Sequence, residues 1–101
     1  MKIRSTPLPT SGVWVFVGDR GRFPSAVFDG TEAAREWIKK HGLTGTLTLY
    51  PLNQGIFDWA ITNEYFEVKA EKEITPSFVQ NFSSAYQEHF HFEDGREAGA
   101  A

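Results

Sequence analysis

Three stretches of this 101-residue chain have the hydrophobic pattern of β-strands. Residues Val13–Val17 are apolar at every position, which is typical of a strand that is covered on both faces or lies near the centre of a sheet. Residues 45–50 alternate threonine with large apolar side chains, and residues 88–93 place Phe90 and Phe92 on the same face. Such alternation indicates strands that are buried on one side only.

The first strand is expected to pair with the next segment in a β-hairpin. Gly18 and Gly21 are predicted to supply the positive φ angles of a tight turn, and residues 23–28 form the returning strand. Pro24 has no N–H donor, so this strand lies at a sheet edge or begins after the proline.

Two main helices are predicted. In the first, Asp29–Glu32 has the form of a capping box, Thr31 competes as the N-cap, and Gly42 ends the helix. The second begins at Thr75, followed by Pro76 at the first helical position, where its missing N–H costs nothing. The apolar stripes are Ala33, Ala34, Trp37, Ile38 and His41 in the first helix, and Phe78, Val79, Phe82, Ala85 and Tyr86 in the second.

The middle of the chain is ambiguous. Residues 56–65 fit a strand or a short helix, and Asn53 as a possible N-cap favours the helix. Residues 65–68 are predicted to form a short strand, and the charged residues 69–73 a solvated loop.

This order of elements predicts an α+β fold. We expect a two-layer sandwich in which a small antiparallel or mixed sheet, including the N-terminal β-hairpin, carries two main helices packed on one face. Residues 1–12 are expected to be a flexible N-terminal segment, residues 13–94 a single α+β domain, and residues 95–101 a flexible C-terminal tail.

Composition narrows the function classes. Thirteen acidic and ten basic residues give a net charge of −3, which argues against a nucleic-acid partner because such proteins carry a basic face. The absence of cysteine excludes disulfides, thiol catalysis and cysteine-bound zinc. With neither a signal peptide nor a membrane-spanning run, no membrane partner is expected and a cytoplasmic location is the prediction.

Several short motifs together resemble a known family. They are Trp14–Phe16, Arg22–Phe28, Trp37–Ile38, residues 45–48 with Tyr50–Pro51, Asp58–Ile61, Phe82–Ala85 and Glu88–Gly95. In these motifs, from about Val13 to Gly95, the chain resembles a family of short bacterial proteins described only as a domain of unknown function. The resemblance implies one fold unit. It implies no activity and no catalytic residues.

His89, His91 and Glu93 are the candidate metal ligands. On a strand they share one face within about 7 Å of each neighbour, because the rise is about 3.3 Å per residue. Two imidazoles and a carboxylate are a common ligand set for divalent zinc or iron. The alternative is an exposed polar face opposite two buried phenylalanines, and no cofactor is otherwise predicted.

Catalytic signatures are weak. Ser25, Ser83 and Ser84 are in no Gly-x-Ser-x-Gly elbow, and nothing in the sequence brings one of them near a histidine. Gly18 and Gly21 match the Gly-x-x-Gly spacing of an RNA-clamping loop, but a hairpin turn explains that spacing better. In that turn, Arg20 and Arg22 are candidates for binding an anion or an acidic partner.

The chain has more aromatic residues than one small core needs. Candidates for the surface are Phe57, Trp59, Tyr65, Phe66 and Tyr86, in a patch rimmed by Asp58, Glu64 and Glu67. Such a patch suits a protein partner, and the alternative is that these side chains cap the core under a loop. Phe57, Asp58, Trp59 and Tyr65, with Arg20 and Arg22, are therefore the predicted partner-binding residues.

These features favour a non-catalytic interaction module over an enzyme. A small acidic protein of this kind suits a protein partner or self-association, and neutralisation of a basic partner fits an inhibitor or immunity role. The alternatives are a metal protein or enzyme built on His89, His91 and Glu93, and a small-ligand binder that uses an aromatic cavity.

Overall fold

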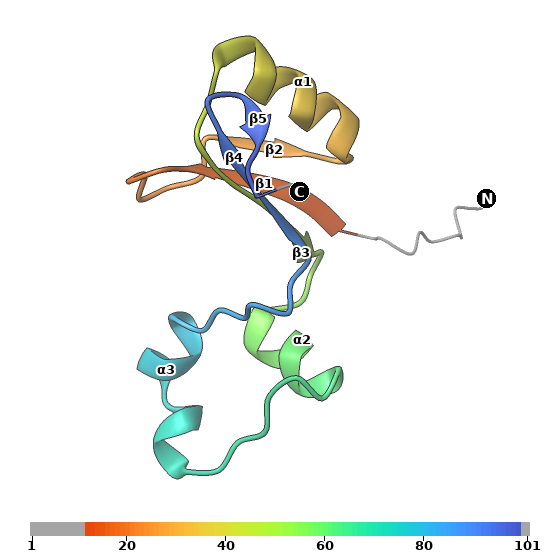
Figure 1. Ribbon diagram of the computed structural model, residues 1–101. Coiled ribbons are helices and arrows are strands. Elements are labelled where there is room, and N and C mark those ends of the chain that lie inside the picture. Colours follow the sequence, from red (N-terminus) through yellow and green to blue (C-terminus); the bar gives the residue numbers. More distant parts are fainter. Residues whose placement is uncertain (1–11, 100–101) are drawn as a thin grey trace, which may run out of the picture. The chain divides into compact units, whose positions relative to one another are not determined.

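The computed structural model describes residues 12–99 in two compact units (Figure 1). We call residues 12–52 and 87–99 the sheet unit, and residues 53–86 the insert unit. The predicted N-terminal segment therefore lies outside the described residues except for residue 12, and so do the last two residues of the predicted tail. Each unit is described by itself.

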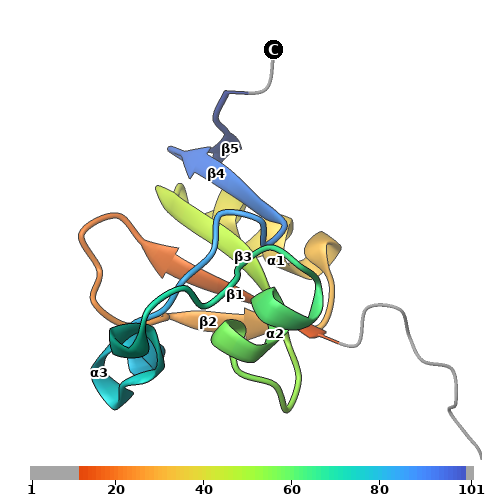
Figure 2. The same cartoon turned by 90° about the horizontal axis from the view of Figure 1, so that it is seen from below.

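The sheet unit is a five-stranded sheet in the order β2-β1-β3-β4-β5, in which all neighbours are antiparallel (Figure 2). The α+β class and the N-terminal hairpin are thus confirmed, and the antiparallel alternative holds over the mixed one. The strands are β1 (Gly12–Gly18), β2 (Ala26–Phe28), β3 (Gly45–Pro51), β4 (His89–Glu93) and β5 (Arg96–Glu97).

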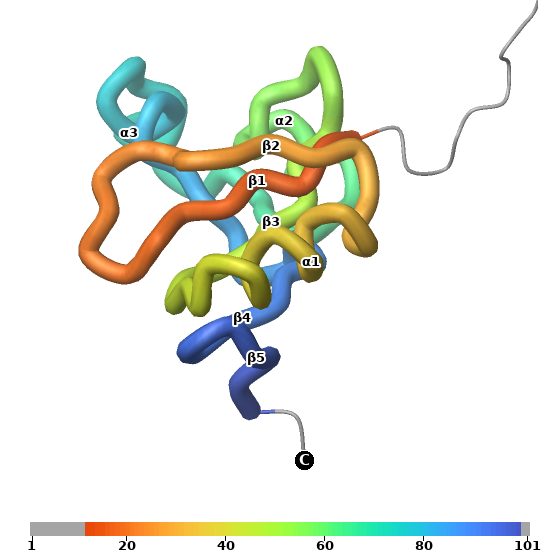
Figure 3. The backbone as a smooth tube through the Cα atoms, turned by 90° about the horizontal axis from the view of Figure 1, so that it is seen from above, coloured from red at the N-terminus to blue at the C-terminus, as the bar shows by residue number. Residues whose placement is uncertain are grey.

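One face of this sheet carries the core. The register places Trp14 opposite Leu49 and Phe16 opposite Leu47, and Leu47 lies opposite Phe90 of β4. Helix α1 (Thr31–His41) lies over this face (Figure 3). The buried core consists of Trp14, Phe16, Ala34, Ile38, Leu47 and Phe92.

The ends of α1 differ in how well they were predicted. Gly42 ends the helix in the left-handed conformation (φ 65°), which confirms its predicted role. The N-cap is Gly30, in extended backbone and with no side-chain cap, so the predicted caps Asp29 and Thr31 are wrong. Thr31 is already the first helical residue, so a cap at that position is one residue too late.

The β1–β2 turn uses an arginine where glycine was expected. Arg20 has the positive φ of 68°, and neither Gly18 nor Gly21 does. Gly21 is required for a different reason: a Cβ there would lie 2.9 Å from the Gly18 carbonyl oxygen, which accepts the Gly21 N–H. Strand β2 begins after Pro24 and lies at the sheet edge, as predicted.

The last hairpin was missed. Asp94 (φ 51°) and Gly95 (φ 86°) form a two-residue turn after which Arg96 pairs with Glu93. Residues 96–97, expected in the flexible tail, therefore form β5, and the Gly95 N–H donates to the Leu43 carbonyl at 2.8 Å.

The insert unit contains three short helical segments. They are α2 (Ile56–Thr62), the 3₁₀ turn η1 (Glu71–Ile74) and α3 (Pro76–Gln80). The helical alternative for residues 56–65 is thus confirmed, but the N-cap is Gly55 and the predicted cap Asn53 is wrong. The solvated loop predicted over residues 69–73 is also wrong, because most of it belongs to η1.

Two further predictions for the insert unit are wrong. Residues 65–68 form no strand, because no strand of the described chain pairs with them. Thr75 does cap α3, accepting the Phe78 N–H, but the helix ends at Gln80 and not near Tyr86. Side chains compete with the backbone there: Asn81 donates to the Ser77 carbonyl, and Ser84 accepts the Tyr86 N–H. The predicted second main helix is therefore only five residues long, which is about one and a half turns.

A second aromatic cluster organises the insert unit. Phe57, Phe66, Phe78 and Phe82 all contact one another, with ring centroids 4.9 to 6.2 Å apart. Ala60 of α2 is completely buried. Much of the aromatic surplus seen in the sequence thus forms a small core of its own.

We expect Gly45→Ala to destabilise the sheet unit by about 1–3 kcal/mol, the usual cost of overpacking. A Cβ there would contact the Val17 carbonyl oxygen and lie 2.7 Å from the Phe16 ring. Gly30→Ser is the control, because its Cβ would meet nothing within 4 Å and serine is favourable at this N-cap position. Urea unfolding followed by circular dichroism measures both. Equal stability of the two variants would contradict the β1–β3 packing.

Candidate functional site

The most exposed aromatic group of the insert unit is a pair of stacked tyrosines. The rings of Tyr65 and Tyr86 are nearly parallel (5°), with centroids 4.4 Å apart, and Trp59 lies 5.3 Å from Tyr65. Tyr65 is 43% exposed and Tyr86 65% exposed. We call Tyr65 and Tyr86 the tyrosine stack. It presents aromatic surface in a fixed orientation.

The turn after α2 places Tyr65 in this stack. The Tyr65 N–H donates to the Ala60 carbonyl at 2.7 Å, and the Glu64 N–H donates to the Ile61 carbonyl at 3.0 Å. This is the hydrogen-bond pattern of a Schellman motif, in which the residue at the position of Glu64 is usually glycine. Glu64 adopts the required positive φ of 62°. The chain thereby turns back so that Tyr65 contacts Trp59 of α2.

The same turn forms a groove. Ile61, Glu64, Phe66, Glu67 and Val68 line a cavity of about 460 Å³, which we call the α2 groove. Its apolar residues Ile61 and Val68 are 39% and 36% exposed. Among residues 12–99 the one ion pair is Arg35–Glu97, so neither glutamate of the groove is paired with a cation there.

The predicted partner-binding residues are divided between the two units. Trp59 and Tyr65 contact each other as the patch prediction required, and Asp58 is exposed on α2. Phe57 is half-buried in the phenylalanine cluster instead. Arg20 and Arg22 are exposed on the β1–β2 loop of the sheet unit, whereas the other four residues belong to the insert unit.

Some site residues were missed at the sequence level. Ile61 and Val68 also line the groove. In the sequence, nothing pointed to them except that they lie near the acidic residues predicted to rim the patch. Tyr86 had been placed in the buried stripe of the second helix as well as among the surface candidates. The early end of α3 frees it to stack on Tyr65.

The predicted metal ligands share one face of β4 but make separate contacts. The His89 Nδ1 donates to the Gln87 carbonyl at 2.7 Å, and the His91 Nδ1 lies 3.3 Å from the Thr46 hydroxyl. The two imidazole rings meet edge to face at 5.1 Å. Within residues 12–99, no group of three or more His, Cys, Asp or Glu side chains is arranged to hold a metal ion.

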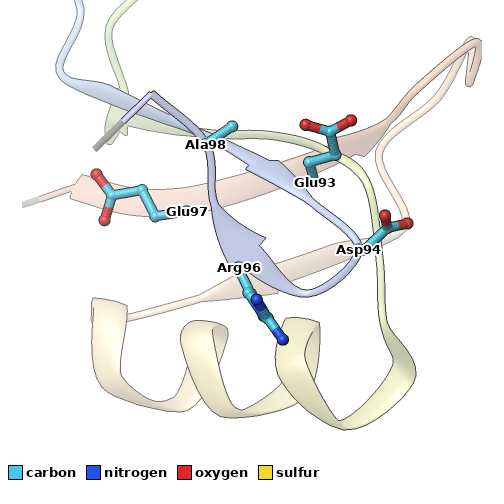
Figure 4. Close-up of a pocket in the computed structure, with 5 residues that line it drawn as sticks. All are labelled: Glu93, Asp94, Arg96, Glu97 and Ala98. Carbon is cyan, nitrogen blue, oxygen red and sulfur yellow. The ribbon is translucent and has the colours of Figure 1, made fainter. Parts of the chain in front are cut away.

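Glu93, the third predicted ligand, lines a different hollow (Figure 4). This cavity of about 420 Å³ lies beside the β4–β5 hairpin, and Asp94, Arg96, Glu97 and Ala98 also line it. In Figure 4 the carboxylate of Glu97 points away from those of Glu93 and Asp94. Glu97 pairs with Arg35 of α1 at 2.8 Å. Three acidic residues therefore line this cavity, but their carboxylates do not point toward a common centre.

Another cavity of the sheet unit brings Ser25, His41 and Asp19 together. It has a volume of about 570 Å³, and Phe16 and Trp37 also line it. Within the described residues, no hydrogen bond joins these serine, histidine and aspartate side chains. Their arrangement thus lacks the nucleophile–base contact of a catalytic triad.

We expect His91→Ala to lower the free energy of unfolding by no more than about 1 kcal/mol, since its hydrogen bond to Thr46 is exposed. Addition of Zn²⁺ should shift the Tm of the wild type and of this variant equally. His41→Ala, an exposed histidine on α1, is the control. A zinc-dependent stabilisation that only His91→Ala abolishes would instead establish the β4 histidines as metal ligands. Thermal unfolding with and without zinc distinguishes the outcomes.

Within residues 12–99, no helix has both the length and the apolar character that crossing a membrane requires.

Comparison with known proteins places the chain in a family. Neither the curated proteins nor the solved structures contain a match to this chain. A family model does match residues 13–98, which include the whole insert unit and, apart from Gly12, every strand of the sheet unit. The chain therefore belongs to the family described as a domain of unknown function, DUF7710.

Proposed function

We propose that this protein is a non-catalytic interaction module that binds a protein partner through its insert unit. The observation that carries the proposal is the exposed tyrosine stack of Tyr65 and Tyr86. Tyrosine is among the residue types that contribute most to the free energy of protein interfaces. Two stacked rings are already held in one orientation, so little side-chain entropy is lost on binding.

Charge indicates the chemistry of the partner. The insert unit has five acidic and two basic residues, whereas the remaining chain has eight of each. The whole net charge of −3 thus comes from the insert unit. A basic partner would be attracted to this unit and oriented by it.

The negative charge of the insert unit argues against self-association through this unit. Two copies that met at their insert units would bring like charges together, which opposes association. A different, basic protein therefore suits the surface better than a second copy of the chain. Inhibition or neutralisation of such a partner is one role that this chemistry permits.

We expect Tyr86→Ala to weaken partner binding at least about tenfold, the effect of losing an interface hot spot. The partner is captured from source cells on wild-type protein, purified, and its Kd measured by calorimetry. Tyr86 is 65% exposed, so its loss should leave the fold intact.

Phe23→Ala is the matched control, because Phe23 is an exposed aromatic residue (76%) on the β1–β2 loop of the sheet unit. If Phe23→Ala abolished binding and Tyr86→Ala did not, the proposal would be wrong. The interface would then include the β1–β2 loop, which contains Arg20 and Arg22. A concentration-dependent dimer in sedimentation velocity would favour self-association instead.

A further inference from the structure

We propose that the α2 groove receives a lysine or arginine side chain of the partner. This inference rests on the proposed function, and it specifies which chemistry the insert unit recognises. The groove is lined by the apolar residues Ile61, Phe66 and Val68 and by two glutamates, Glu64 and Glu67. A basic side chain has the matching parts, an apolar stem and a cationic end.

One apolar residue of the groove is held in place by the core of the insert unit. Phe66 lines the groove, and its ring also lies 4.9 Å from Phe82 and 5.8 Å from Phe78. Ile61, which precedes Phe66 in the sequence, and Val68, which follows it, add exposed apolar surface to the groove. The groove is therefore a formed surface against which the methylene groups of a lysine or arginine can pack.

The two glutamates are available for a cation. Glu73 differs, because its carboxylate accepts the backbone N–H groups of Lys69 and Ala70 at 2.6 and 3.2 Å. Among residues 12–99 the carboxylates of Glu64 and Glu67 have neither a hydrogen-bond donor nor an ion-pair partner. An acidic side chain would be repelled there, and an aliphatic one would leave both carboxylates without a counter-charge.

The groove can be probed without knowing the partner. The probe is Nα-acetyl-lysine methylamide, titrated into ¹⁵N-labelled full-length protein and followed by backbone amide shifts. We expect shifts concentrated in residues 61–68, with millimolar affinity that falls as salt increases. The Nε-acetylated probe, which keeps the stem and loses the charge, should bind at least about two- to fivefold more weakly, because one exposed ion pair contributes that much and the probe loses its attraction to both glutamates.

Variants then test the individual carboxylates. Glu64→Gly removes one carboxylate at a position whose positive φ glycine tolerates better, so loss of folding cannot explain its effect. Glu67→Gln removes the other while keeping its shape. We expect each to weaken lysine binding about two- to fivefold. Glu71→Gln is the control, because it makes the same charge change at an exposed residue outside the groove.

Three results would overturn the inference. They are an absence of shifts in residues 61–68, equal binding of the charged and the acetylated probes, and equal weakening by Glu71→Gln, which would show a diffuse effect of net charge. None of these results bears on the tyrosine stack. If Tyr86→Ala still abolishes partner binding, the interaction module stands and only the basic-side-chain groove fails.

Discussion

The antiparallel register between β1 and β3 is the constraint on which the rest of the structure depends. It places Trp14 and Phe16 on the same face as Leu47 and Leu49, and a shift by one residue would turn every side chain of β1 to the other face. Helix α1 packs on the face so formed. Arg35 of that helix lies 4.6 Å from the centre of the Phe90 ring and pairs with Glu97. Strands β4 and β5 are thereby joined to the same helix.

Parts of the fold with a local cause could be predicted from the sequence. The apolar run of β1, the alternation of β3 and the helix-ending Gly42 each depend on neighbouring residues, and each was found. The hairpin at Asp94 and Gly95 also has a local cause, because the dipeptide Asp-Gly favours a two-residue turn. The prediction of a flexible tail from residue 95 overlooked this signal. The positive φ of Arg20 has no such local signal, because arginine has no preference for it.

The candidate site was predictable in composition but not in geometry. An excess of aromatic residues over the needs of one core indicated that some lie at the surface, and Tyr65, Glu64 and Glu67 are indeed exposed. The same reasoning could not assign Phe57 to a second core, since that depends on four rings meeting through the tertiary structure. Nor could it bring Tyr86 onto Tyr65, which requires that α3 end early.

The division into two units separates the residues of the proposed binding surface from the strands of the sheet. At the base of the insert unit, the Leu49 N–H donates to the Glu88 carbonyl, and the buried Gln87 side chain donates to the Leu49 carbonyl at 3.1 Å. These hydrogen bonds join β3 to residues 87–88, which follow the insert unit in the sequence. Exposed aromatic residues and left-handed non-glycine residues occur in both units, because Phe23 is 76% exposed and Arg20 has a φ of 68° in the sheet unit. The excess of acidic residues, in contrast, is confined to the insert unit. Repulsion between like charges reduces stability, so an uneven distribution of charge suits a binding surface, whereas the balanced charge and buried core of the sheet unit suit a scaffold.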